Sequence, residues 1–63
     1  MEYILTITLI YQNGNLTKVD IYHVDGFKTE KACLSYASME DKHLKRIKAQ
    51  TNIKSFELNC YGR

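Results

Sequence analysis

The sequence predicts an α+β fold in which strands and a helix follow one another in the order ββαβ. Three observations predict it: a β-branched apolar run at Tyr3–Tyr11, an Asn13-Gly14 dipeptide after it, and helical spacing of apolar residues from Thr29 onward. Alternation with period two indicates a strand, Asn-Gly a hairpin, and recurrence every three or four residues a helix. A chain of 63 residues has room for a single domain, spanning 1–63, with a thin core.

The first strand, at about residues 2–12, is the element around which we expect the sheet to form. Its odd positions, from Tyr3 to Tyr11, are all apolar or aromatic. Its even positions are isoleucine and threonine, at Ile4, Thr6, Thr8 and Ile10. We therefore expect the odd face of the strand to be buried and the even face to be exposed.

The second strand is expected at Leu16–Asp25, and the loop before it decides which of its faces is buried. A two-residue loop at Asn13-Gly14 would place Lys18 and Asp20 opposite the apolar face of the first strand. A three-residue loop, Gln12-Asn13-Gly14, avoids this, because a shift of one residue turns every side chain over. We predict the three-residue loop. With this loop, the inner side chains of the second strand are Val19, Ile21 and His23, and its outer side chains are Lys18, Asp20 and Tyr22.

A single helix is expected from the N-cap Thr29 to about Ala49. Glu30 suits the first turn, because anionic side chains interact favourably with a helix N-terminus. The segment Ser38–Asp41 resembles a second capping signal and leaves a break at that point as the alternative. The predicted inward stripe is Ala32, Cys33, Tyr36, Ala37, Glu40, Leu44 and Ile47.

The third strand is expected at Ile53–Tyr61, with Phe56, Leu58 and Cys60 on its inner face. A helix that connects the second and third strands makes those two strands parallel to each other. The simplest sheet then has the first strand in the middle, antiparallel to both neighbours, in the order 2-1-3. The helix covers one face of this sheet, and the predicted core joins it to Leu5, Ile7, Leu9, Val19, Ile21, Phe56 and Leu58.

The other face of the predicted sheet is open. A one-sided antiparallel sheet is ordinary in water, but this face also carries apolar area that suits an unidentified protein partner or a second copy of the chain. We predict protein binding by Ile4, Thr6, Thr8, Ile10 and Tyr22. The two outer strands are also sheet edges, which are able to pair with another chain.

A basic segment near the end of the helix gives the alternative function, nucleic-acid binding. Residues 42–63 carry six basic side chains against one acid, whereas residues 1–41 are net acidic. Four of the cations could contact phosphates: Lys42, Lys45, Arg46 and Lys48. The same cations would also stabilise the C-terminus of the helix, and no aromatic residue lies among them to stack on bases.

The two cysteines, Cys33 and Cys60, both fall on predicted core faces. We expect two buried, reduced thiols, with a disulfide between them as the alternative. The histidines, His23 and His43, have no zinc-site spacing to the cysteines, so we expect no metal.

No residue pattern indicates an enzyme or a cofactor site. Glu40 and Asp41 are adjacent, so on a helix they point to different sides, and neither cysteine lies beside a cue that would lower its pKa. Glu2 stands where a signal peptide has basic residues, and the apolar run is too short to span a bilayer. We therefore expect a cytoplasmic protein with no membrane association.

The second half of the chain resembles small accessory proteins encoded by bacteriophages and prophages. The residues that carry the resemblance are Phe27-Lys28-Thr29-Glu30-Lys31-Ala32-Cys33 and Phe56-Glu57-Leu58-Asn59-Cys60-Tyr61. In such proteins a helix that opens with a cysteine is followed by a terminal strand with a second cysteine. The resemblance implies a protein that acts by binding, such as an inhibitor or regulator of a host protein.

Overall fold

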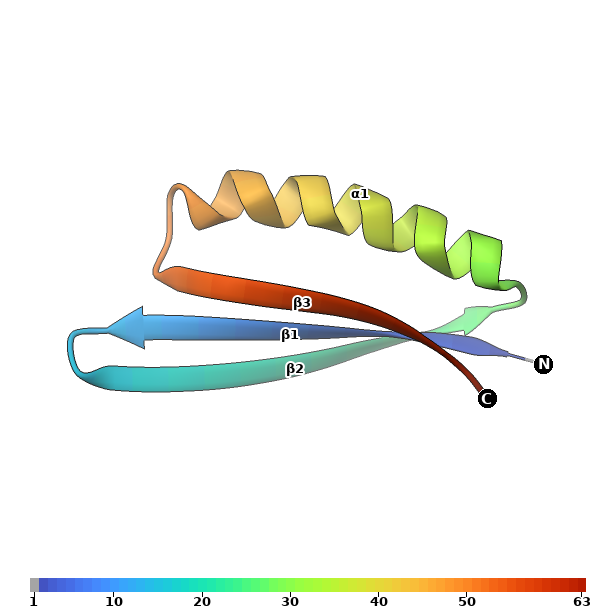
Figure 1. Ribbon diagram of the computed structural model, residues 1–63, viewed down its shortest axis with the longest axis horizontal. Coiled ribbons are helices and arrows are strands. Elements are labelled where there is room, and N and C mark those ends of the chain that lie inside the picture. The colour runs from blue at the N-terminus through green and yellow to red at the C-terminus, as the bar shows by residue number, and fades with distance from the viewer. Residues whose placement is uncertain (1) are drawn as a thin grey trace.

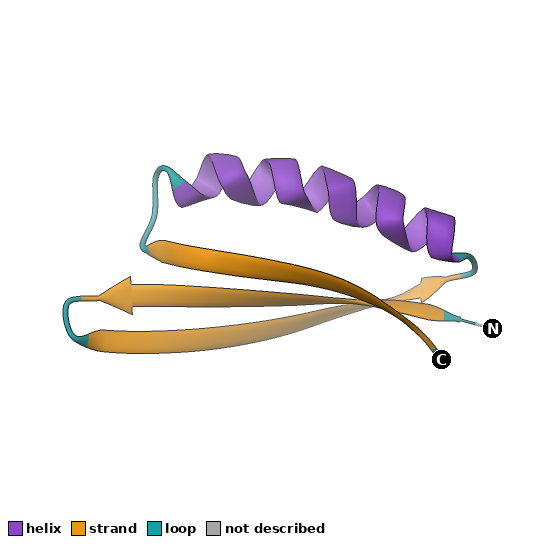
Figure 2. Cartoon of the chain, in the orientation of Figure 1, coloured by secondary structure: helices purple, strands orange, loops and turns teal. Residues whose placement is uncertain are grey.

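The computed structural model describes residues 2–63. Strand β1 spans Tyr3–Asn13, β2 spans Leu16–Phe27, helix α1 spans Glu30–Lys48 and β3 spans Ile53–Gly62. The strands form one antiparallel sheet in the order β2-β1-β3, accompanied by the helix (Figure 1 and Figure 2). The predicted α+β class, the ββαβ order and the central position of the first strand are confirmed.

The central strand β1 holds the core together with one of its faces. Leu5 is completely buried, and Ile7 and Leu9 are nearly so. The even residues between them are half-buried, because the neighbouring strands flank them but no second layer covers them. Burying a large aliphatic side chain stabilises a fold by roughly 1.5–3 kcal/mol, so these three residues matter greatly in so small a core.

The register of β2 differs from the prediction. Asn13 lies opposite Leu16, and only Gly14 and Asn15 form the turn between them. Gly14 has a φ of 63°, whereas no non-glycine residue among 2–63 has a positive φ. A glycine with positive φ at the first loop position followed by a residue with negative φ is typical of a type II′ hairpin turn. The predicted three-residue loop is therefore wrong.

The true register exchanges the two faces of β2. Val19 and Ile21 lie opposite Ile10 and Thr8, on the sheet face away from the helix, and His23 lies opposite Thr6. The alternate residues of β2 turn toward the helix side: Lys18, Asp20 and Tyr22 lie opposite Tyr11, Leu9 and Ile7. Val19 and Ile21, which were predicted to lie in the core, are therefore outside it.

The position of the helix explains why charges are tolerated opposite the apolar face of β1. The helix packs mainly against β3 and hardly contacts β2. In Figure 1 it lies beyond β3, on the side of the sheet opposite to β2. Lys18 and Tyr22 consequently remain in water, and Asp20 is only half-buried. The prediction assumed that the helix covers the whole sheet, which a single helix does not do here.

The pairing of β1 with β3 has the predicted faces. Leu9, Ile7 and Leu5 lie opposite Phe56, Leu58 and Cys60, all on the helix side. The register shifts by one residue between Ile10 and Tyr11, which brings the buried Ile53 opposite Tyr11. The backbone N–H of Gln12 also donates to the carbonyl of Asn52 at 3.0 Å, which ties the hairpin to the loop before β3.

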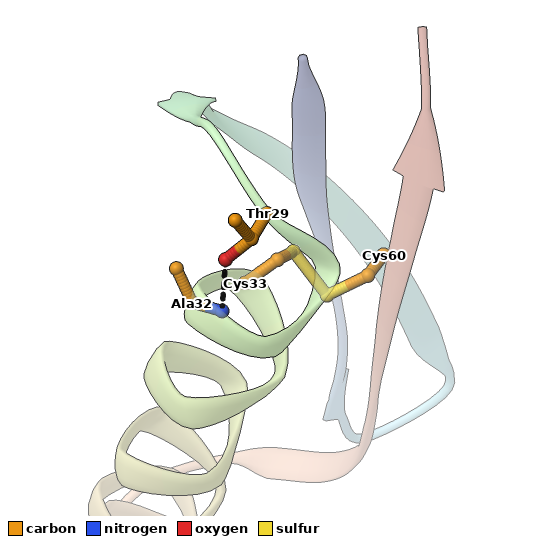
Figure 3. The surroundings of a disulfide bond; sticks show 4 residues. All are labelled: Thr29, Ala32, Cys33 and Cys60. Carbon is orange, nitrogen blue, oxygen red and sulfur yellow. Dashed lines mark hydrogen bonds between the residues drawn. A yellow bond between two sulfur atoms is a disulfide. The ribbon is translucent and has the colours of Figure 1, made fainter. Parts of the chain in front are cut away.

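The helix is continuous, so the break near Ser38 is not found. Thr29 is its N-cap, and its side-chain oxygen accepts a hydrogen bond from the Ala32 N–H at 3.1 Å (Figure 3). Cys33 and Leu44 are buried against the sheet, whereas Tyr36 is 36% exposed and contacts the ring of Phe27, with 5.4 Å between ring centroids. Of the rest of the predicted stripe, Ala37, Glu40 and Ile47 are half-buried and Ala32 is exposed.

A disulfide joins Cys33 in the first turn and a half of the helix to Cys60 near the end of β3 (Figure 3). Their Cα atoms are 6.2 Å apart. The prediction favoured two reduced thiols, and the disulfide that it held as the alternative is the state found. Cys33 is completely buried, so the bond belongs to the core rather than to the surface.

Candidate protein-binding surface

Within residues 2–63, no other element covers the sheet face away from the helix, and we call it the open sheet face. Its side chains come from all three strands. They are Ile4, Thr6, Thr8 and Ile10 from β1, Thr17, Val19, Ile21 and His23 from β2, and Ser55, Glu57, Asn59 and Tyr61 from β3. Most of these side chains are apolar, β-branched or uncharged, so the face is suited to contact with a protein.

The β2 half of this face carries an apolar patch, defined as Ile10, Val19 and Ile21. Val19 is 53% exposed and Ile21 is 57% exposed, and the half-buried Ile10 lies directly opposite Val19. Single exposed apolar residues are normal on protein surfaces, but contiguous exposed ones more often mark interaction sites. The register of the hairpin, rather than the composition alone, brings these three residues together.

The β3 half of the open sheet face is more polar. Ser55 and Glu57 lie opposite Ile10 and Thr8, and Asn59 lies opposite Thr6. On the other flank, the Thr6 hydroxyl is 3.3 Å from Nδ1 of His23. The face therefore combines the apolar patch with hydrogen-bonding groups on β3 and at Thr6 and His23.

Four of the five residues predicted to bind protein lie on this face, namely Ile4, Thr6, Thr8 and Ile10. Tyr22 does not, because the register places it opposite Ile7 on the helix side, where it is 51% exposed. Its assignment to the open sheet face is wrong. Val19 and Ile21 lie on this face although the sequence placed them in the core, and the signal that could have placed them correctly is the Gly14-Asn15 dipeptide, itself a two-residue hairpin pattern.

A hollow of about 390 Å³ lies on the helix side of the sheet, near the hairpin turn. Its lining is mixed, with Tyr11, Asn13, Leu16, Lys18, Asp20 and Asn52. Nζ of Lys18 is 3.9 Å from a carboxylate oxygen of Asp20. The hollow exists because the helix does not extend over β2, and this charged pair would be the polar contact for any group that entered it.

The basic segment is exposed along the last turns of the helix. Lys42, Lys45, Arg46 and Lys48 all face solvent. Nζ of Lys45 lies 3.0 Å from the carboxylate of Asp41, one turn earlier, so part of the positive charge is balanced locally. Because three of the four cations lie in the last turn, they also complement the helix dipole.

Within residues 2–63, no group of three or more His, Cys, Asp or Glu side chains is placed to hold a metal ion. Both cysteines are consumed by the disulfide. No helix in this part of the chain is both long and apolar enough to cross a membrane.

Comparison of the chain with models of protein families, with curated proteins and with solved structures found no match.

Proposed function

We propose that this chain is a small, non-enzymatic protein-binding module whose binding surface is the open sheet face. The observation that carries the proposal is the apolar patch, in which Val19 and Ile21 are more than half exposed beside Ile10. An exposed surface of this kind is costly in water and becomes favourable when a partner covers it. The module would act by occluding the surface that it covers.

The shape of the molecule supports this mode of action. The molecule is long and thin, with principal extents of 42 × 20 × 11 Å, so its three long strands present an extended surface for so short a chain. With a core this thin, there is little volume for an enclosed reaction chamber. The resemblance of residues 27–33 and 56–61 to phage accessory proteins suggests a protein of a bacterial host as the partner, with inhibition or regulation as the outcome.

The experiment compares capture of host proteins by the immobilised chain and by matched variants. Ile10→Asp places a charge in the centre of the apolar patch and should abolish capture of the partner. Leu34→Asp makes the same chemical change at an exposed site on the helix, where Leu34 is 51% exposed, and should leave capture intact. Equal capture by wild type and Ile10→Asp would contradict the proposal.

The same experiment separates protein binding from nucleic-acid binding. Contacts with phosphates weaken steeply as salt rises, whereas apolar association weakens little. A double variant, Lys45→Glu with Arg46→Glu, should therefore capture the same partner as the wild type, also at high salt. Loss of binding in this variant, together with recovery of nucleic acid by the wild type, would favour the alternative function.

We also propose that the module acts in the cytoplasm, which the disulfide makes directly testable. Disulfides are rare in cytosolic proteins because cellular thiols keep cysteines reduced. In the cytoplasm we therefore expect the Cys33–Cys60 pair to be reduced in at least part of the molecules. Alkylation of free thiols in intact cells, followed by mass analysis, would report the state of the pair. A fully oxidised pair in every molecule would point to an oxidising compartment instead.

A further inference from the structure

The outer edge of β2 is free. One side of β2 pairs with β1, no strand lies on its other side within residues 2–63, and the helix lies toward β3 (Figure 1). The edge is 12 residues long, from Leu16 to Phe27. A free edge of this length presents unpaired N–H and C=O groups, which form a template for another strand.

The hairpin turn determines which residues present these groups. Asn13 and Leu16 flank a two-residue turn, so they form a pair that exchanges both backbone hydrogen bonds. Hydrogen-bonded and non-hydrogen-bonded pairs alternate along an antiparallel ladder. Leu16, Lys18, Asp20 and Tyr22 therefore bond toward β1. The residues that direct their backbone groups to the free edge are Thr17, Val19, Ile21 and His23.

A second copy of β2 is a candidate for this edge, because one antiparallel register brings its opposite charges together. An antiparallel copy must place outward-bonding residues opposite each other and keep the two sheet faces continuous. Of the neighbouring registers that do so, one opposes the two copies of Lys18 and another opposes the two copies of Asp20. The register between them, centred on Val19, opposes Lys18 to the partner's Asp20 and Asp20 to the partner's Lys18.

We propose that two copies of this chain pair edge to edge through antiparallel β2 strands, with Val19 on the twofold axis. On the helix side, the two Lys18–Asp20 cross-strand pairs are flanked by Leu16 opposite the partner's Tyr22. Leu16 and Tyr22 are 75% and 51% exposed in the single chain, so this contact removes apolar area from water. On the open sheet face, Val19 meets the partner's Val19, and Ile21 meets the partner's Thr17.

Between Leu16 and Tyr22 this register opposes Lys18 to Asp20 and Leu16 to Tyr22, and it opposes no like charges. Opposite charges and apolar pairs directly across an antiparallel ladder each stabilise it by roughly 0.2–1 kcal/mol, whereas like charges destabilise it. Charges on an edge strand also hinder pairing with unrelated strands. Lys18 and Asp20 therefore exclude most partners while admitting a second copy, and the contact is isologous, as in most homodimers.

The dimer would join the two sheets into one continuous sheet and double the open sheet face. The inference does not depend on which molecule that face binds. An edge-to-edge contact is smaller than the ~1,600 Å² of a standard interface, so we expect a dimer that forms and dissociates with concentration. A dimer has twice the 7.4 kDa mass of the chain, so a measurement of mass distinguishes the monomer from the dimer.

The test measures mass by sedimentation over a range of concentrations, for the oxidised full chain and three charge variants. Lys18→Asp and Asp20→Lys should each dissociate the dimer, because each places like charges opposite each other across the axis. The double variant, Lys18→Asp with Asp20→Lys, restores opposite charges and should restore the dimer. Lys54→Asp reverses an exposed charge on β3 and should leave the dimer unchanged.

Cysteine cross-linking reports the register itself. Val19→Cys places one cysteine on each side of the twofold axis. Their Cα atoms would be about 5.5 Å apart, a separation that a disulfide can bridge. Ile21→Cys lies opposite the partner's Thr17 and should not cross-link. Circular dichroism of each variant establishes that it is folded. The double charge variant also distinguishes loss of the charge pairs from misfolding. If the single substitutions acted by misfolding the chain, combining them would not restore the dimer.

Three results would overturn the proposal. They are a wild type that stays monomeric at millimolar concentration, a dimer that persists in both single charge variants, and a cross-link through Ile21→Cys in place of Val19→Cys. Ile10→Asp gives a further distinction, because it alters the open sheet face and leaves the β2 edge intact. If it alone dissociates the dimer, the copies associate face to face and not through the edge.

Discussion

Asn13 and Leu16 face each other as the last pair of the β1–β2 ladder, with Gly14 and Asn15 closing the chain between them. The length of this turn fixes the register of the whole hairpin. The register in turn places Val19 and Ile21 on the open sheet face and Lys18, Asp20 and Tyr22 on the helix side. The binding surface and the proposed dimer edge both depend on this one turn.

Gly14→Ala should therefore destabilise the fold by about 1–2 kcal/mol. Among residues 2–63, no heavy atom other than those of Gly14 and its chain neighbours lies within 4 Å of where a Cβ at Gly14 would be, so the cost comes from its φ of 63° and not from a clash. Chemical denaturation measures the change. The 63-residue chain is short enough for total synthesis, and a D-alanine at this position, which prefers positive φ, should restore stability. Equal loss with both alanine enantiomers would show that the turn has another geometry.

Leu5→Ala should destabilise the protein by about 2–5 kcal/mol, because Leu5 is completely buried and its loss leaves a cavity. A core of this size rarely supplies more than about 3–5 kcal/mol, so the variant should be largely unfolded at room temperature. Far-ultraviolet circular dichroism and urea denaturation measure this. Leu34→Ala, at an exposed helix position, is the control and should change stability by no more than about 0.5 kcal/mol.

Reduction of the Cys33–Cys60 bond should lower the free energy of unfolding by roughly 3–4 kcal/mol. The two cysteines are 27 residues apart in sequence, and a closed loop of that length removes this much entropy from the unfolded chain. Urea denaturation with and without a reductant measures the difference. A variant with Cys33→Ala and Cys60→Ala should be as unstable as the reduced protein and insensitive to the reductant. The same denaturation midpoint in both conditions would mean that the bond contributes nothing.

Thr29→Ala should cost about 1 kcal/mol, because it removes the acceptor of the Ala32 N–H at the start of the helix. Thr29→Ser keeps the hydroxyl and should recover most of the loss. Ser38→Ala changes an exposed mid-helix residue without removing a cap and should leave stability nearly unchanged. Thermal unfolding of the three variants gives the comparison. Equal effects of Thr29→Ala and Ser38→Ala would mean that the cap is unimportant.

The fold was predictable because local and long-range signals agree at most positions. The alternation in β1 marks Leu5, Ile7 and Leu9 as one face, and Thr29 marks the start of the helix. The odd face of β1 also has to meet Phe56 and Leu58, which share a face of β3. The sheet order follows from these constraints, since only β1 can lie in the middle.

The register of β2 was not predictable in the same way. Apolar Val19 and Ile21 alternate with charged Lys18 and Asp20, which favours burial of the apolar pair only where the helix covers the strand. The helix instead packs against β3 and leaves β2 nearly uncovered, and no pattern within β2 reports that. In β2 the geometry of the turn, and not the pairing of apolar residues, therefore determines the register.

The candidate site was predictable where it depends on β1 alone. Thr6, Thr8 and Ile10 follow from alternation in a central strand, whereas Tyr22 and Val19 exchange sides with the register of the hairpin. The oxidation state of the cysteines was also open. Two cysteines on core faces are compatible with a bond or with free thiols, and only the distance between helix and strand decides whether they can meet.

The disulfide also determines how the molecule would carry a mechanical load. Tyr3 pairs with Gly62, so a force that pulls residues 2 and 63 apart would first unzip β1 from β3, starting at that end. Once the separation reaches Cys60, tension passes through the sulfur atoms to Cys33 and bypasses the residues between them. Most of the helix and most of β3 then bear no force, and about 90 Å of contour length stays hidden while the bond is intact.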